Sequence, residues 1–265
     1  MSTTDSLTGL TQSPVVILAG DTPWTWALAR KLRERFGEIP IVVEEKESTG
    51  QFLARRVRRL GIVTVLGQIA FGITARLIRP LYRRQENEIL SREGLVPAPI
   101  SDRIIKVASA NDPKTVELLN QLRPRIVIVS QTRILARRVL TDVPAVFINV
   151  HTGITPNYRG LHGAYWALAV GDESNCGVTV HVVDAGIDTG PVIARAIIRP
   201  SEFDSYFTYH WAQLAAGLPL LIRAVEDALA GRLATIPSVA ATNSRLFYHP
   251  TLWEYLWNGL RRGVW

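Results

Sequence analysis

Short apolar segments, each followed by the start of a helix, are the feature that most limits the fold of this chain. The first segment, Pro14–Gly20, is closed by glycine, and Asp21-Thr22-Pro23 then supplies a capping residue and a proline for a helix to about Phe36. Further apolar segments suited to buried parallel strands lie at 39–43, 104–107 and 125–129. This alternation predicts an α/β fold: a Rossmann-like, doubly wound, mostly parallel sheet with helices on both faces.

The length of 265 residues suits one large domain with a small appendage. Residues 1–13 are rich in Ser and Thr and lack the basic and apolar regions of a signal peptide, so we expect a disordered leader. Residues 14–200 would form the α/β domain. Residues 201–265 would form a C-terminal helical extension packed on that domain, with a helix near 209–231 and an aromatic tail after it.

Residues 50–92 form a basic, apolar insertion that interrupts the strand–helix alternation. Four arginines within 55–59 lead into the stretch 62–78, in which only Gln68 and Arg76 are strongly polar. This stretch is too short and too interrupted to predict a transmembrane helix. We expect helices here, and three roles remain open: peripheral contact with a membrane surface, a cover over the protein's own core, or a homodimer interface.

The net charge of +7 and the isoelectric point near 9.9 raise the question of a nucleic-acid partner. Because the arginines concentrate between Arg55 and Arg84 and no motif for reading nucleic acid is present, we expect a local basic surface and no nucleic-acid partner. The single cysteine, Cys176, excludes an intramolecular disulfide and a Cys-based zinc site, and it suits the cytoplasm. Ligand clusters such as His-Glu-x-x-His are missing, so we expect no metal.

An apolar strand at 147–151 ends by presenting an amide and an imidazole, Asn149 and His151. Residues two apart in a strand lie on the same face, so both side chains should point the same way. The carboxyl ends of strands are where open α/β sheets bind ligands. The following loop, rich in Gly, Pro and hydrogen-bond donors, is long enough to form the wall of a site.

A second apolar strand, 177–183, carries His181 and leads to Asp184 and Asp188. The sequence therefore places Asn149, His151 and a downstream carboxylate at two successive strand ends. A carboxylate raises the pKa of a nearby imidazole, and an amide with an imidazolium can stabilise a developing oxyanion. These groups suit acyl transfer to an amine, with Asp188 organising the removal of a proton from the attacking nitrogen.

These two motifs resemble those of the formyltransferases that use 10-formyltetrahydrofolate. The resemblance covers roughly residues 125–195. It is carried by Asn149-x-His151 with Pro156-x-Tyr158-Arg159-Gly160, and by Gly177-x-Thr179-x-His181 with Asp188-x-Gly190.

The resemblance implies that Asn149, His151 and Asp188 are the catalytic residues and that 10-formyltetrahydrofolate is the co-substrate. The residues that it implies for the folate pocket are Arg133, Ile134, Leu135, Asp184 and Gly186. The residues that it implies as supporting or substrate-binding are His181, Tyr158, Arg159 and Gly160.

The acceptor amine stays open. The phosphoribosylglycinamide formyltransferases carry a Gly/Ser/Asn-rich phosphate loop where this chain has Asp21, which would repel a phosphate. Only 72 residues follow Ile193, so we do not expect a tRNA acceptor. A small-molecule primary amine remains, such as a nucleotide-linked amino sugar. The alternatives are a 10-formyltetrahydrofolate hydrolase, a glycinamide ribonucleotide formyltransferase and, from a different class, a non-catalytic protein that binds a membrane or partner.

Overall fold

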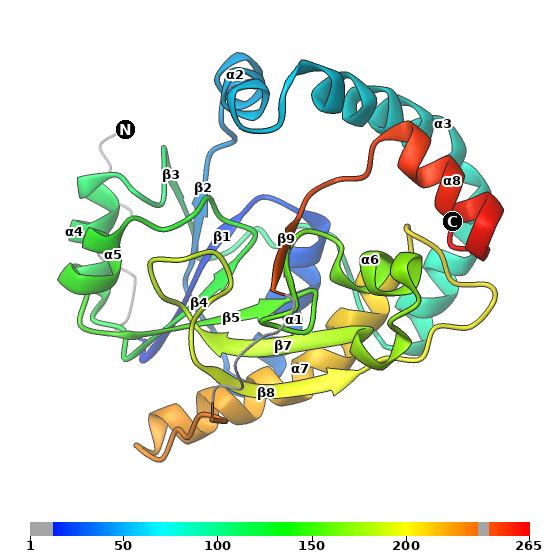
Figure 1. Ribbon diagram of the computed structural model, residues 1–265. Helices are drawn as coiled ribbons and strands as arrows, with labels where there is room; N and C mark the ends of the chain where they lie inside the picture. Colours follow the sequence, from blue (N-terminus) through cyan, green and yellow to red (C-terminus); the bar gives the residue numbers. More distant parts are fainter. Residues whose placement is uncertain (1–12, 238–243) are drawn as a thin grey trace.

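A seven-stranded sheet forms the centre of the computed structural model, which describes residues 13–237 and 244–265 (Figure 1). Its strands are β1 (Val15–Gly20), β2 (Ile41–Glu44), β3 (Ile104–Val107), β4 (Ile126–Ser130), β5 (Val146–His151), β7 (Gly177–Val182) and β8 (Val192–Ile197). Their order is β3-β2-β1-β4-β5-β7-β8, and β1 to β5 run parallel. The predicted Rossmann-like sheet is confirmed. The predicted leader, apart from Ser13, lies outside the described residues.

Helices cover both faces of the sheet because its strands are apolar on both sides. On one face lie α1 (Pro23–Phe36) and α7 (Tyr209–Leu229), and on the other lie α4 (Pro113–Leu122) and α5 (Arg137–Asp142). Side chains alternate along β1: Ile17 packs with the core under α1 and α7, whereas Leu18 packs with the core under α4 and α5. Helix α7 thus shares one core with β5 and β7.

The start of α1 follows from its sequence. Thr22 has extended backbone geometry, and its hydroxyl accepts a hydrogen bond from the backbone N–H of Thr25 at 3.2 Å. Pro23 occupies the first turn, where it has no intrahelical N–H to lose. This cap fixes the entry to α1 beside the end of β4, at the point where the strand order reverses.

The direction of β7 differs from what the sequence suggested. We expected Asn149, His151 and Asp188 to come together at the ends of two successive strands, yet β7 runs antiparallel to β5 and pairs Asn149 with His181. The carboxyl end of β7 therefore lies beside Ile148, and the following loop folds back toward the end of β5. Asp188 reaches His151 through this reversal of the chain.

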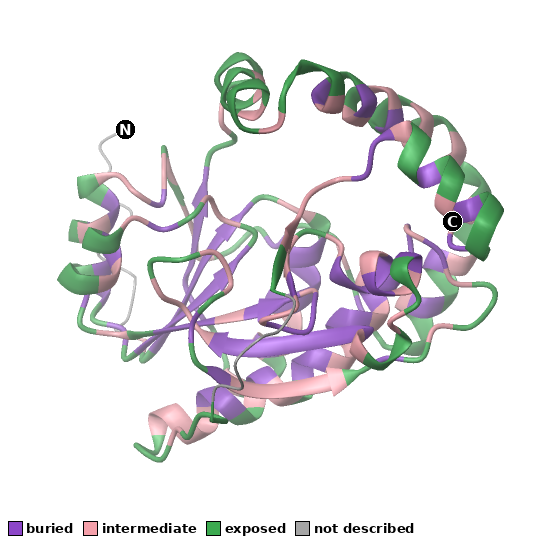
Figure 2. Ribbon diagram, in the orientation of Figure 1, coloured by how far each residue is buried: buried purple, intermediate pink, exposed green. Residues whose placement is uncertain are grey.

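Three helices form an arm beside the sheet: α2 (Thr49–Leu60), α3 (Ile62–Arg92) and α8 (Leu252–Arg262). In Figure 1, α2 and α3 arch away from the sheet and α8 lies along α3. Phe71 of α3 is buried with Tyr255 of α8 and Tyr165 of α6 (Gly163–Val170). One face of the arm thus covers a hydrophobic cluster, which agrees with the predicted role of a cover over the protein's own core. Figure 2 shows that much of the opposite side of α3 is exposed.

The aromatic tail returns to the loop that follows β5. Strand β9 (Arg245–Phe247) pairs in parallel with β6 (Tyr158–Gly160), and the rings of Phe247 and Tyr158 stack at 5.3 Å. A short 3-10 helix, η1 (Glu173–Asn175), precedes β7. Neither β6 nor β9 was expected from the sequence. Their pairing holds the loop 152–162 against the rest of the chain.

Candidate active site

Asn149 and His181 face each other across the paired strands β5 and β7. The Asn149 amide nitrogen lies 3.2 Å from His181 Nε2, and His181 Nδ1 lies 2.9 Å from the backbone oxygen of Val182. Since a carbonyl oxygen only accepts, Nδ1 carries a proton and donates it to Val182. With the proton on Nδ1, Nε2 can accept a hydrogen bond from the Asn149 amide. The antiparallel register is the direct cause of this contact.

Asp188 lies between two histidines. Its Oδ2 is 3.4 Å from His151 Nδ1, and its Oδ1 is 3.7 Å from His181 Nε2. Oδ2 also accepts a hydrogen bond from the backbone N–H of Gly160 at 2.8 Å. Asp188 itself has φ of +52°, in the left-handed region, where aspartate is among the more tolerant side chains. The structure therefore brings the three predicted catalytic residues together and places His181 with them.

The electrostatics of this cluster correct one expectation. Burial lowers the pKa of His151, and this effect outweighs the opposing pull of Asp188 and of the Tyr158 carbonyl. His151 is thus held toward its neutral form, not toward the imidazolium that the sequence suggested. Burial alone would raise the pKa of Asp188, but His151, His181 and the Gly160 N–H together lower it to about 2. Asp188 is ionised at neutral pH.

The loop after β5 positions the imidazole of His151. His151 Nε2 lies 2.7 Å from the backbone oxygen of Tyr158, and the Tyr158 hydroxyl donates to Asp172 at 2.8 Å. Arg159 donates to the backbone oxygen of Ile187 at 3.3 Å, which ties this loop to the one that carries Asp188. Tyr158, Arg159 and Gly160 therefore act on the cluster through the backbone they hold in place.

A cavity of about 530 Å³ opens beside these groups, within the range of small-molecule sites. The cavity is lined by Asn149, His151, His181 and Asp188, and by the predicted folate-pocket residues Arg133, Ile134, Leu135, Asp184 and Gly186. The structure thus gathers the residues of both motifs around one space. Tyr158 and Arg159 are not among its lining residues.

The two loops that border this cavity are fixed by local hydrogen bonds. Asp184 accepts from the Gly186 N–H at 3.0 Å and from the Thr189 hydroxyl at 2.8 Å, so its carboxylate shapes the turn. Gly186 is needed because an added Cβ would lie 1.9 Å from the Thr189 hydroxyl. On the other side, the Ile134 carbonyl accepts from the side chain of Asn111 at 2.9 Å.

Arginines of α2 line the outer part of the cavity, and the sequence motifs did not identify them. Arg55, Arg56 and Arg59 contribute to the lining, together with Tyr248 from the C-terminal segment. The buried Nε and Nη2 of Arg56 have no hydrogen-bond partner among the described residues. Burial lowers the pKa of this guanidinium. A half-buried guanidinium with two nitrogens that lack hydrogen-bond partners in the described part of the chain, beside a cavity, is suited to an anionic ligand group.

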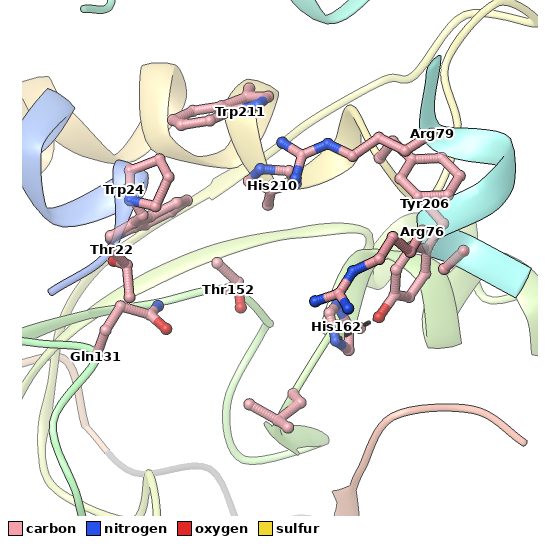
Figure 3. Close-up of a pocket in the computed structure, with 14 residues that line it drawn as sticks. Thr22, Trp24, Arg76, Arg79, Gln131, Thr152, His162, Tyr206, His210 and Trp211 are labelled. Carbon is pink, nitrogen blue, oxygen red and sulfur yellow. Dashed lines mark hydrogen bonds between the residues drawn. The ribbon is translucent and has the colours of Figure 1, made fainter. Parts of the chain in front are cut away.

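A second cavity, of about 430 Å³, lies where the strand order reverses between β1 and β4 (Figure 3). Thr22 and Trp24 border it from the start of α1, Gln131 from the end of β4, and Thr152 from the residue after His151. It therefore adjoins the catalytic cluster. Open α/β sheets bind ligands at such reversal points, which is the signal that would have located this cavity from the sequence.

The wall of the second cavity opposite the sheet comes from α3 and α7. In Figure 3, Arg76 and Arg79 extend from α3 toward the cavity. Arg79 is paired with Glu86 at 2.7 Å, whereas Arg76 has no hydrogen bond or ion pair with any described residue. His162 and His210 also line this cavity, and burial lowers the pKa of both.

Comparisons with known proteins agree with this arrangement. The family model described as "Formyl transferase" matches residues 75–223, which is more than half of the chain. Methionyl-tRNA formyltransferase from Pelotomaculum thermopropionicum is 33% identical over 121 residues, covering 45% of this chain and 38% of that protein. The corresponding protein from Kosmotoga olearia is 28% identical over 166 residues, covering 60% of this chain and 52% of that protein. The chain thus matches about half or less of each of these relatives.

Solved structures share the fold. Glycinamide ribonucleotide transformylase 1 from Symbiobacterium toebii superposes with a TM-score of 0.55 at 20% identity, covering 89% of this chain and 95% of that one. An N-formyltransferase from Helicobacter canadensis, solved with folinic acid and dTDP-3-aminofucose, gives 0.53 at 13% identity, covering 89% and 70%. At these identities the likeness concerns the fold alone.

Proposed function

This chain belongs to the formyl transferase family, and from that premise we propose that it transfers a formyl group from 10-formyltetrahydrofolate to the primary amine of a small molecule. The observation that carries the proposal is the cluster of Asn149, His151 and Asp188 at the edge of a cavity of about 530 Å³. We place the reaction in the cytoplasm, consistent with a single, buried, unpaired cysteine.

In the proposed reaction, the acceptor nitrogen attacks the formyl carbon, and the formyl oxygen gains negative charge. The Asn149 amide and the His151 imidazole stabilise this oxyanion. Asp188, ionised at neutral pH, accepts the proton that the attacking nitrogen loses. The bond from the formyl carbon to N10 of the folate then breaks, the proton passes to N10, and the products are a formamide and tetrahydrofolate.

The residues around the first cavity fit a folate. Backbone groups at Arg133, Ile134 and Leu135 and the turn at Asp184–Asp188 would hold the pterin. The arginines of α2 provide the cations that the carboxylates of a glutamate tail need, and Arg56 has two buried nitrogens without partners among the described residues. Tyr248 adds an aromatic face beside Arg59, whose guanidinium lies 5.5 Å from its ring.

The second cavity suits the acceptor amine. The second cavity is lined by Thr152, the residue after His151, and therefore lies beside His151. Arg76 supplies a cation that has no hydrogen bond or ion pair with any described residue. An acceptor with a phosphate would place its negative charge at Arg76 and its amine toward Thr152. A nucleotide-linked amino sugar has both groups. The phosphate would approach from α3, away from Asp21, which accepts a hydrogen bond from Trp26 at 3.0 Å.

A folate-turnover assay with a panel of amines tests this function. Purified protein should convert 10-formyltetrahydrofolate to tetrahydrofolate only in the presence of the correct amine among nucleotide-linked amino sugars, glycinamide ribonucleotide and free amino acids. Steady turnover without any amine would identify a hydrolase. His151→Ala should lower turnover by about a hundredfold or more, since the oxyanion loses a main partner. Full activity in that variant would contradict the mechanism.

A further inference from the structure

An apolar surface on two neighbouring helices of the arm has no covering element among the described residues. It consists of exposed side chains of α3 and α8, which we call the α3–α8 face: Ile62, Val63, Leu66, Ile69, Ile73, Leu77, Leu81, Trp253, Leu256, Trp257 and Leu260. Leu77, Leu81 and Leu260 are 73%, 75% and 79% exposed. Large apolar patches of this kind mark sites that bind another protein or a membrane.

The spacing of these residues gives α3 two opposite apolar sides. The exposed positions recur every three or four residues over five turns, so they share one side of the helix. The buried positions Val65 and Phe71 face the protein. Helix α3, about 46 Å long by its 31 residues, has the length and composition of a membrane span. Because one side packs on the protein, it is suited to lie on a bilayer and not to cross it.

The charge around this surface is predominantly positive, with Glu254 as the one carboxylate of α8. Residues 48–85 contain eight arginines and no Asp or Glu. Among these arginines, Arg58, Arg76, Arg83 and Arg84 have no hydrogen bond or ion pair with any described residue. At α8, the Arg261 guanidinium lies 5.5 Å from the ring of Trp257, which is 60% exposed. Basic residues beside exposed Leu, Ile and Trp are the composition of helices that rest at the interface of an anionic bilayer.

The same charges argue against a second copy as the occupant. A symmetric dimer through the α3–α8 face would apply the same patch from both subunits. The arginines of both subunits would then lie close to one another, because 48–85 contains no carboxylate and Glu254 of α8 is already hydrogen-bonded to Thr251. Anionic lipid head groups, in contrast, neutralise them. We propose that the α3–α8 face seats the protein on the surface of an anionic lipid bilayer, a property separate from the proposed formyl transfer.

This seating has a consequence for the second cavity. Arg76 and Arg79 of α3 line that cavity (Figure 3), while Ile73 and Leu77 of the same helix are exposed and belong to the α3–α8 face. The acceptor cavity would then lie about one helix diameter, roughly 10 Å, from the lipid head groups.

Vesicle flotation tests the proposal. The full chain should float with vesicles of phosphatidylcholine mixed with phosphatidylglycerol, float much less with phosphatidylcholine alone, and detach as salt is raised. The affinity of the triple variant Leu77→Gln, Leu81→Gln, Leu260→Gln for the anionic vesicles should fall by about tenfold or more. Three of the most exposed apolar side chains are lost in this variant. The matched control, Ile197→Gln with Ile236→Gln, removes exposed apolar side chains at β8 and should bind as the parent does.

Three outcomes would overturn the proposal: no flotation of the parent chain with the anionic vesicles, equal flotation of the triple variant, or a concentration-dependent dimer in sedimentation that the triple variant abolishes without any vesicle binding. Folate binding by calorimetry on the same preparations separates this result from the formyl-transfer proposal. A chain that binds folate but no vesicle contradicts only the seating, whereas a chain that floats but binds no folate contradicts only the transfer.

Discussion

The catalytic cluster and the helical arm differ in where their charged side chains lie and in what those side chains bind. Around Asp188 the charge is buried between His151 and His181, and its Oδ2 accepts a hydrogen bond from the Gly160 N–H. On α3 the charge is exposed, and Arg76, Arg83 and Arg84 have no partner among the described residues. Buried charge must be satisfied inside the protein, because water is not available to do it. Exposed charge beside an apolar surface can instead be neutralised by the groups that the surface binds, here the proposed anionic lipid head groups. The first region therefore suits the proposed chemistry, and the second suits the proposed contact with a bilayer.

Neutralising Asp188 disrupts the catalytic cluster, and we expect it to have the largest effect of the four changes. Asp188→Asn keeps the shape of the side chain but removes the proton acceptor and the negative charge beside His151. We expect turnover to fall by about a thousandfold, measured as formation of tetrahydrofolate with the amine that supports turnover in the parent chain. Asp227→Asn is the matched control, since Asp227 of α7 pairs with Arg232 at 2.8 Å and lines neither cavity. An Asp188→Asn variant with parental activity would remove Asp188 from the mechanism.

A substitution that forces α8 away from α3 disrupts the helical arm. A Cβ added at Gly67 would lie 2.2 Å from the ring of Trp253, so Gly67→Ala must displace that ring. We expect the free energy of unfolding to fall by about 1–3 kcal/mol, measured by urea denaturation. Gly72→Ala lies on the same helix and meets no atom within 4 Å, so it should leave stability unchanged or raise it by up to about 1 kcal/mol. Equal stability of the two variants would refute this packing.

Acid should weaken the fold while it leaves the Asp188 charge intact. Burial lowers the pKa of His210 and His249 to about 4, below the ordinary value of about 6.5. A histidine with a lowered folded-state pKa stabilises the fold above pH 6.5, and that contribution is lost as the pH falls from 6.5 to 4. We expect a loss on the order of 2 kcal/mol per histidine, measured by urea denaturation at pH 7.5 and 4.5. His249→Gln should reduce the pH dependence, and an unchanged dependence would exclude His249 as its source.

Arg76 lies on α3 of the arm and also lines the second cavity. We expect its substitution to have the smallest effect of the four. If Arg76 holds a phosphate of the acceptor, Arg76→Gln should raise the acceptor KM by about tenfold and leave folate binding unchanged. Arg223→Gln, an exposed arginine on α7 that lines neither cavity, is the control. An unchanged KM for a phosphate-bearing acceptor would place that phosphate elsewhere, and a loss of folate binding would assign Arg76 to the first cavity.

Much of the fold and of the catalytic cluster could be predicted because their signals are local. Apolar strands with capped helices predicted β1, α1, β4 and β5, and two short motifs brought Asn149, His151 and Asp188 together. The reversal of β7 could not be predicted, since a buried strand reads alike in parallel and antiparallel pairs. Arg56 and Arg76 were missed for a related reason: each lies on a helix distant in sequence from the motifs, and only the tertiary packing brings it to a cavity.

The register of β5 on β7 also limits how this protein can change in length. Asn149 is paired with His181, and side chains alternate between the two faces of a strand. Inserting or deleting one residue within β7 would turn His181 to the opposite face and leave the Asn149 amide without its partner. Five of the six residues of β7 are buried, so a substitution here must also fit packed neighbours. We therefore expect related chains to keep the number of residues in β7 fixed.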